Sequence, residues 1–304
     1  VRAWGPITHY TFACASETNA TACLCDGRPE SLTLMQGARA PDAFYFGYAP
    51  FLAGSSCPQT PGLHDPLFAS YMVKWANTTT QRTFALGFGT HVVSDVIGFS
   101  SNGYFVANPK ALVNNNIDWL FTWPLMLNVD SVLLSNITCA AQLPTTAMSS
   151  EIAAFVSAST QKYKLLKNSF PNLTETQVAS CSSAWTQNVN NMGRVSTRTS
   201  ASTSASMLEV FSPYGAMSQA TALHNLARQE ECAKSTVMTW RKALMEENKT
   251  PEEAVVAATQ FLATLTAAGK CTPPGAGTRV DTSTATRSSS PWRAMLDVLS
   301  SSQR

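Results

Sequence analysis

Residues 83–98 form a long apolar stretch that is interrupted by a few polar residues. It is long enough for one buried helix, and it carries His91 and Asp95 four residues apart. On a helix this spacing places both side chains on one face, one turn apart. Gly87 and Gly89 precede them. Because a glycine costs about 1 kcal/mol relative to alanine inside a helix, they indicate the close approach of a second helix.

The His91 and Asp95 pair has two interpretations. In the first, both residues are ligands of one metal ion. In the second, a histidine in the core forms a hydrogen bond with a neighbouring aspartate. The pair alone leaves both open.

Apolar residues at helical spacing, together with N-terminal capping signals, predict further helices. Residues 4–20 are expected to contain the first, beginning near Pro6. Asp65 followed by a proline, and Ser149 followed by Glu151, each start another. The faces expected to be buried are Leu67, Phe68, Tyr71, Met72 and Trp75 in the first of these two helices, and Ile152, Phe155, Val156, Tyr163 and Leu166 in the second.

Two capping boxes mark later helix starts. Thr174 and Gln177 form one, and Thr250 and Glu253 form a stronger one. The helix after Thr250 is expected to stop at Gly269. Strand signals are scarce throughout, so the predicted fold class is all-α. We expect a single large helical domain at residues 1–272.

Three other segments lack a clear helical pattern. Residues 23–57 are rich in Gly, Pro and Ser and predict long loops, and residues 194–206 predict a Ser/Thr-rich surface loop. Residues 273–304 predict a Ser/Thr/Pro-rich linker and a short amphipathic tail helix. This helix either packs on its own domain or binds a neighbouring molecule. Its apolar face is Trp292, Met295, Leu296 and Leu299.

Composition excludes two functional classes. The 304 residues are 44% hydrophobic and only 13% charged, and the formal net charge is +2. This charge, without a run of Lys or Arg, argues against a nucleic-acid binder. No apolar run reaches the ~20 residues that a transmembrane helix needs. The nearest, residues 119–127, is too short and contains Pro124.

Cysteine usage and glycosylation signals indicate a secreted protein, extracellular or at the cell surface. The even number of cysteines and their scattered spacing favour disulfides over zinc thiolates, with the pairing left open. The cysteines are Cys14, Cys23, Cys25, Cys57, Cys139, Cys181, Cys232 and Cys271. Five Asn-x-Ser/Thr sequons begin at Asn19, Asn77, Asn136, Asn172 and Asn248.

Three of the four histidines lie in the first third of the chain: His9, His64 and His91. Asp42 lies among aromatic residues, where an aspartate is costly unless it is paired or binds a metal. With Asp95 these residues offer three imidazoles and two carboxylates, a ligand set suited to zinc. The fourth histidine, His224, is followed four residues later by Arg228 and is expected to be a surface or packed helix residue.

Four short stretches carry a resemblance to a known family. They are Trp4-Gly-Pro-Ile-Thr-His9, Pro41-Asp-Ala-Phe-Tyr45, Leu63-His-Asp-Pro-Leu-Phe68 and the stretch from Leu86 to Val96. In order and spacing they resemble the zinc-dependent phospholipase C superfamily, most closely the N-terminal domain of glycosylphosphatidylinositol-specific phospholipase D. The resemblance covers residues 4–100. It implies one α-helical domain with a three-zinc cluster at the bottom of a cleft.

The resemblance also implies roles for the candidate ligands. Asp42, His64, His91 and Asp95 would bind one zinc ion, and Asp42 is also the candidate catalytic residue. Asp95 would bridge to a second zinc ion, whose remaining ligands would be His9 and the backbone amine and carbonyl of Trp4. The expected cofactor is therefore one or two zinc ions.

The chain departs from the family where the third zinc ion would bind. The family has a further histidine just after the equivalent of Asp95, but residues 97–103 contain none. It then has a His followed four residues later by Glu. Here the nearest analogue is Asn114 and Asp118, and asparagine is a poor zinc ligand. The third zinc ion is therefore expected to be lost.

The second zinc ion depends on the N-terminus. Val1-Arg2-Ala3 would suit the end of a cleaved signal peptide, which would make Trp4 the mature N-terminus. The presence of these residues in the chain argues against that cut. If they stay attached, Trp4 has no free amine and the second zinc site is weakened.

Three hypotheses follow. The first is a secreted zinc phosphodiesterase with a reduced metal site, acting on phospholipid-type or other phosphodiesters with impaired or altered hydrolysis. The second is a catalytically degenerate coat or filament subunit that self-assembles, or binds an extracellular partner, through its C-terminal tail. The third is a metal-free helical binding protein, if the resemblance is accidental. Fold alone does not decide among them.

Overall fold

A computed structural model of the chain describes residues 4–15, 20–46, 61–98, 112–113, 116–117, 129–130, 133, 137, 141–198 and 219–271. The regular secondary structure of these residues is helical with one exception, which confirms the all-α prediction. The exception is a two-residue antiparallel pair, β1 (Leu112–Val113) with β2 (Asn116–Ile117). None of the described helices combines the length and apolar composition needed to cross a bilayer.

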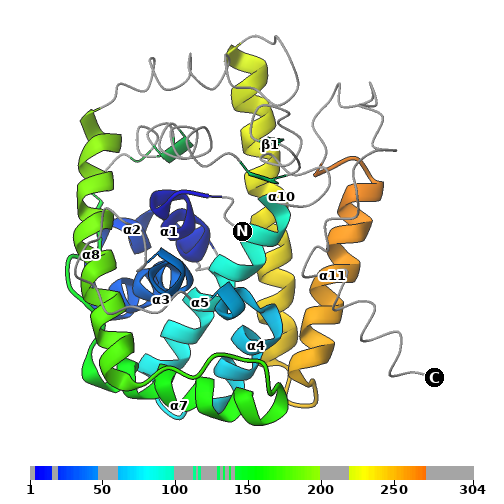
Figure 1. The fold of residues 1–304 in the computed structure, drawn as a ribbon. Coiled ribbons are helices and arrows are strands. Elements are labelled where there is room, and N and C mark those ends of the chain that lie inside the picture. The colour runs from blue at the N-terminus through cyan, green and yellow to red at the C-terminus, as the bar shows by residue number, and fades with distance from the viewer. Residues whose placement is uncertain are drawn as a thin grey trace.

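The helices pack around α5, which passes through the middle of the molecule with α3 and α4 beside it (Figure 1). Side chains of α5 are buried on every face, as expected of a helix that is apolar all round. In chain order the helices are α1 (Pro6–Ala15), α2 (Ala20–Cys25), α3 (Pro29–Phe46), the 3-10 helix η2 (Pro61–His64), α4 (Pro66–Trp75), α5 (Thr79–Gly98), α7 (Ser150–Leu166), α8 (Glu175–Arg198), α10 (Gln219–Met245) and α11 (Pro251–Ala267).

Glycines allow α3 and α5 to touch backbone to backbone. A Cβ atom at Gly87 would overlap the carbonyl oxygen of Leu34, and one at Gly37 would overlap the carbonyl oxygen of Phe84. The predicted close approach of a second helix at Gly87 is therefore confirmed. Gly89 accommodates a different neighbour, the indole ring of Trp240 from α10. This packing brings the C-terminal parts of α3 and α5 together.

The prediction of long loops at residues 23–57 is wrong for the part of that range that the structure describes. Residues 29–46 form α3, one of the central helices. Its glycine and prolines have other functions than turns. Pro29 occupies the first helical position, where proline is favoured. Gly37 provides the contact with α5, and Pro41 lies within the helix.

Most predicted helix starts are confirmed by their hydrogen bonds. Asp65 accepts from the backbone N–H of Leu67 at 2.9 Å and begins α4. Ser149 caps α7. The two capping boxes also form, Thr174 with Gln177 and Thr250 with Glu253.

Two details of the later helices differ from the prediction. Leu166, expected to be buried, is 60% exposed, because α7 ends at this residue and its core contacts are made earlier, by Ile152, Val156 and Tyr163. The predicted loop at residues 194–206 is wrong for its first part, since α8 continues to Arg198. Residues 199–206 lie outside the described part of the chain.

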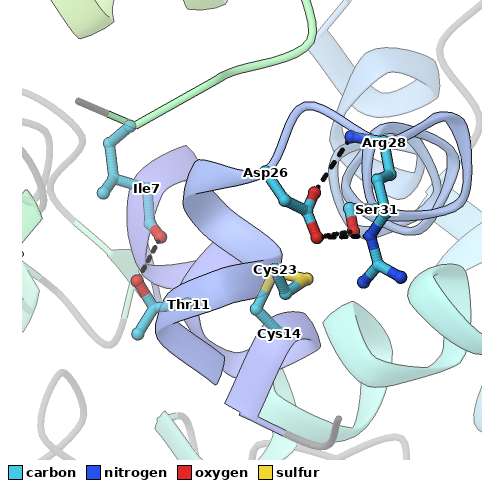
Figure 2. Close-up of a disulfide and its surroundings, with 7 residues drawn as sticks. All are labelled: Ile7, Thr11, Cys14, Cys23, Asp26, Arg28 and Ser31. Atoms are coloured by element: carbon cyan, nitrogen blue, oxygen red, sulfur yellow. Dashed lines mark hydrogen bonds and ion pairs between the residues drawn. A yellow bond between two sulfur atoms is a disulfide. The ribbon is translucent and has the colours of Figure 1, made fainter. Parts of the chain in front are cut away.

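Disulfides join neighbouring helices at both ends of the described chain. Cys14 at the end of α1 is bonded to Cys23 in α2 (Figure 2). The turn after α2 is held by Asp26, which accepts hydrogen bonds from the backbone and side chain of Arg28 and from Ser31 (Figure 2). The disulfide between Cys232 and Cys271 joins α10 to the short segment that follows α11. Cys25 and Cys181 are also disulfide-bonded.

Several other predicted residues can be placed. The sequon asparagines Asn77, Asn172 and Asn248 are exposed, as a glycan requires. The remaining two sequons, Cys57 and Cys139, and the predicted tail at residues 273–304 lie outside the described residues.

Candidate metal centre

Four separate elements bring five predicted ligands into one buried cluster. His9 comes from α1, Asp42 from α3, His64 from the end of η2, and His91 and Asp95 from α5. Four of these residues are at most 3% exposed, and the side chain of His64 is the most accessible at 10%. Burial of three imidazoles and two carboxylates at one point is costly unless a cation or a proton balances them.

Four ligand atoms face one another at nearly equal spacing. His91 Nε2 lies 3.3 Å from His64 Nε2, 3.4 Å from Asp95 Oδ2 and 3.7 Å from Asp42 Oδ1. His64 Nε2 lies 3.6 Å from Asp42 Oδ1 and 3.8 Å from Asp95 Oδ2. Most of these separations exceed an ordinary N–H···O hydrogen bond of about 2.9 Å. His91 Nε2 and His64 Nε2 are close enough for one hydrogen bond, and both nitrogens lie at similar distances from the two carboxylate oxygens.

A backbone carbonyl fixes the orientation of His91. His91 Nδ1 lies 2.6 Å from the carbonyl oxygen of Ala38 in α3. A carbonyl oxygen can only accept, so His91 Nδ1 carries a proton and donates it. In the neutral ring Nε2 then presents its lone pair to the cluster. This is the usual second hydrogen bond of a metal-binding histidine.

Ser94 orients His9 in the same way. The hydroxyl of Ser94 donates to the carbonyl oxygen of His91 at 2.9 Å, which leaves its oxygen to accept from His9 Nδ1 at 3.3 Å. His9 Nε2 consequently faces Asp95 Oδ1 at 3.4 Å with its lone pair. The ring of His9 also stacks on that of His91, with centroids 3.7 Å apart.

Burial and charge set the protonation of the cluster. Burial lowers the pKa of His9 to about 3 and also lowers the pKa of His64. For His91, burial opposes the charged form, but Asp95 and Asp42 raise the pKa overall. Burial acts to raise the pKa of Asp95, yet His91 and His9 hold it below its usual value. The neutral imidazoles of His9 and His64 and the ionised carboxylate of Asp95 are the forms that bind a metal ion. His91, whose pKa is raised, would release its extra proton when it binds one.

The cluster contains two overlapping sets of ligands that could hold a metal ion. One is His9, Asp42 and His91, and the other is His64, His91 and Asp95. Within each set the ligand atoms all lie within 4.8 Å of one another. The predicted grouping of the five side chains is thus found, although no metal identity follows from it.

The side chain of Trp4 is not one of the clustered ligand groups. Its indole Nε1 donates to the carbonyl oxygen of Ser94 at 3.0 Å, so the buried side chain of Trp4 packs beside the cluster. The predicted role of its backbone as a ligand stays a prediction. Asn114 and Asp118 lie outside the described residues, and His224 belongs to α10, in a part whose side chains are not described.

Asp130 supports the site, and no local sequence pattern indicated this role. Its carboxylate accepts from the backbone N–H of Ile7 at 3.1 Å, and from the backbone N–H and hydroxyl of Thr8 at 2.9 and 2.7 Å. It therefore caps the helix that carries His9. Burial raises the pKa of Asp130 to about 7, although the hydrogen bonds from Thr8 and Ile7 favour its ionised form.

Replacing Asp130 with Ala should lower the free energy of unfolding by about 3 kcal/mol, because three buried donors lose their acceptor. Asp130→Asn is the matched control, since its amide oxygen still accepts from Thr8, and it should cost less. Chemical denaturation of the three proteins measures the order. Equal stability of all three would show that Asp130 does not hold the start of α1.

The comparisons with known proteins add no relative. Searches of the chain against protein-family models, curated proteins and solved structures give no significant match. The case for a metal centre therefore depends on its geometry. Five buried His and Asp side chains from α1, α3, η2 and α5 have their ligand atoms close to one another.

Proposed function

We propose that the cluster binds zinc, and the observation that carries this proposal is the spacing of four ligand atoms. With zinc–nitrogen and zinc–oxygen bonds of roughly 2.0–2.2 Å, neighbouring ligands of a tetrahedral site lie roughly 3.3–3.6 Å apart. Five of the six separations among Asp42 Oδ1, His64 Nε2, His91 Nε2 and Asp95 Oδ2 are 3.3–3.8 Å. Two carboxylates would balance the charge of a divalent ion held by two neutral imidazoles.

A second, weaker zinc ion would lie between His9 and Asp95. The two oxygens of Asp95 face different partners, Oδ1 toward His9 and Oδ2 toward His64 and His91. Asp95 is therefore suited to bridge two ions. Asp42 and His91, which also lie near His9, are assigned to the first ion. His9 and Asp95 are then the described side chains left for the second ion, and its other ligands would come from the backbone of Trp4 or from water.

The function we propose is hydrolysis of phosphodiesters, the reaction of the zinc-dependent phospholipase C superfamily that the sequence resembles. Catalysis requires a coordination position beyond these four ligands, which zinc gains when it becomes five-coordinate. A water at that position would have a lowered pKa, and the ion would neutralise charge that develops on the phosphodiester. Asp42 is also the proposed acceptor of the proton of that water, through the carboxylate oxygen that is not assigned to the ion. Substrate would approach beside His64, whose side chain is the most accessible in the cluster.

The charge available for a phosphate is limited. Arg39 lies one turn before Asp42, but its guanidinium donates to the carbonyl oxygens of Pro144 and Thr146. It therefore fastens α3 to the segment before α7 and is not directed to substrate. With fewer zinc ions than its resemblance implies, the protein is expected to hydrolyse phospholipid-type phosphodiesters slowly. A substrate with a good leaving group is the right first probe.

The experiment is hydrolysis of bis(p-nitrophenyl) phosphate and of phosphatidylcholine by the full chain, loaded with zinc or treated with chelator. We expect zinc-dependent release of product, at least about 100-fold slower in Asp42→Asn, since general acid–base groups contribute roughly 10²–10⁴-fold. His224→Ala is the control, with unchanged rate. If the zinc-loaded protein hydrolysed neither substrate, the proposed enzymatic activity would be wrong. That result would favour a structural or assembly protein with the same fold.

A further inference from the structure

The C-terminal end of α7 exposes two adjacent leucines. Leu165 is 87% exposed and Leu166 is 60% exposed, which makes this the one place in the described chain where two large apolar side chains next to each other are both open to water. A single exposed leucine needs no explanation, but a contiguous apolar pair at a helix end does. We call Lys162, Lys164, Leu165, Leu166 and Lys167 the α7 tip.

The charged residues next to these leucines along the chain all have one sign. Residues 152–174 contain no Asp or Glu, and three lysines of the α7 tip are the charged residues of this stretch. All three are exposed. Lys162 lies over the ring of Trp75 at 5.6 Å, and Lys167 pairs with Asp65 at 3.0 Å. In a chain with only 13% charged residues, a basic and apolar tip is a distinct surface.

The α7 tip is fastened to the residue that follows His64, the most accessible ligand of the metal centre. The hydroxyl of Tyr163 and the ammonium of Lys167 both donate to Asp65 Oδ2, each at 3.0 Å. Asp65 follows His64 directly, and both belong to the segment that joins η2 to α4. Just beyond the tip, Phe170 packs on Phe68 with ring centroids 4.7 Å apart. The tip therefore has a fixed position relative to His64.

We infer that the α7 tip docks the protein on an anionic phospholipid surface. Leucines inserted at the level of the headgroups, with lysines at the phosphates, are the usual features of a protein that lies on a membrane. The lysine stems can lie along the apolar boundary while their ammonium groups reach the phosphates. A second copy of this chain fits less well, because the tip would bring like charges together.

Docking would place the His64 side of the centre toward lipid headgroups. This consequence rests on the proposed hydrolysis of phospholipid-type phosphodiesters, whereas docking itself needs no metal ion. The two can therefore fail separately. Asp95→Asn, which is expected to lose zinc, should bind vesicles as the unchanged protein does.

The experiment is co-sedimentation of the full chain with phosphatidylcholine vesicles that contain or lack phosphatidylserine. We expect binding to the anionic vesicles that weakens at high salt. Leu165→Ser combined with Leu166→Ser should reduce it about tenfold or more, because the apolar contact is lost. Lys164→Glu should reduce it only on anionic vesicles. Met238→Ser, which changes a 54% exposed side chain of α10, is the matched control and should bind normally.

The double variant changes exposed side chains, so an unchanged circular dichroism spectrum and melting temperature are expected. Each protein is assayed before and after removal of N-glycans, because Asn172 is exposed just beyond the tip. No binding of the deglycosylated protein to anionic vesicles would overturn the inference, as would equal binding by the double variant. A concentration-dependent dimer that the double variant loses, without vesicle binding, would also overturn it and assign the tip to self-association.

Discussion

Replacing Asp95 with Asn is expected to remove both zinc ions from the protein, whereas His9→Ala removes only the second. The carboxylate of Asp95 faces His9 with one oxygen and His64 and His91 with the other. The amide keeps the shape of the side chain but loses the charge and one acceptor. Because loss of a hydrogen bond behind a ligand already costs roughly 10–100-fold in metal affinity, loss of a bridging ligand should cost at least about 100-fold.

Elemental analysis after dialysis against trace zinc measures this difference. The expected contents are one or two zinc ions in the unchanged protein, no more than one in His9→Ala and close to none in Asp95→Asn. His224→Ala is the control for loss of a histidine, with zinc unchanged. Far-ultraviolet circular dichroism checks that each variant is folded. If Asp95→Asn retained as much zinc as the unchanged protein, the bridging role of Asp95 would be wrong.

Replacing Gly87 with Ala is expected to lower the free energy of unfolding by about 3 kcal/mol or more. On an exposed helix the same change would stabilise by about 1 kcal/mol. Here the new Cβ would overlap the carbonyl oxygen of Leu34, and a backbone atom in a central helix cannot move aside cheaply. For a chain of this size the melting temperature should fall by roughly 6–12 °C.

The separation of α3 from α5 should also weaken the centre, because Asp42 belongs to α3 while His91 and Asp95 belong to α5. Zinc affinity should therefore fall together with stability, although no ligand has changed. Thr80→Ala, an exposed position in the first turn of α5, is the matched control and should leave both unchanged. A Gly87→Ala protein as stable as the control would contradict the backbone contact between α3 and α5.

Local signals in the sequence were sufficient for the start of most helices. The Asp65 cap and the two capping boxes are made between residues at most three positions apart, so their chemistry can be read directly. The spacing of His91 and Asp95 likewise fixed their common face on α5. These features depend on helix geometry alone and need no knowledge of the surrounding chain.

Features that depend on distant contacts were missed or misread. The glycine and prolines of α3 resemble turn signals, but Gly37 allows the close contact with α5 and Pro29 occupies the first helical position. Leu166 continues an apolar pattern, but α7 ends before it reaches a partner. Asp130 caps α1 from a position 122 residues away from Thr8, and no local pattern encodes such a contact.

The candidate site lies between these two cases. Five candidate ligand residues could be named from the sequence, through the apolar surroundings of Asp42, the helix start beside His64 and the family resemblance. These ligands come together only because four elements pack against one another. The same packing places the carbonyl oxygen of Ala38 and the hydroxyl of Ser94 where they accept hydrogen bonds from His91 and His9. These bonds decide which nitrogen of His91 and His9 faces the ion.

The most direct test of the central claim is the metal content of the protein purified from its natural source. Mass spectrometry of the elements, set against protein concentration, gives the number of ions per chain. We expect one to two zinc ions at the cluster of His9, Asp42, His64, His91 and Asp95. Protein that was never exposed to a chelator and contains no zinc would contradict the central claim, and would leave these residues as a hydrogen-bonded cluster within the core.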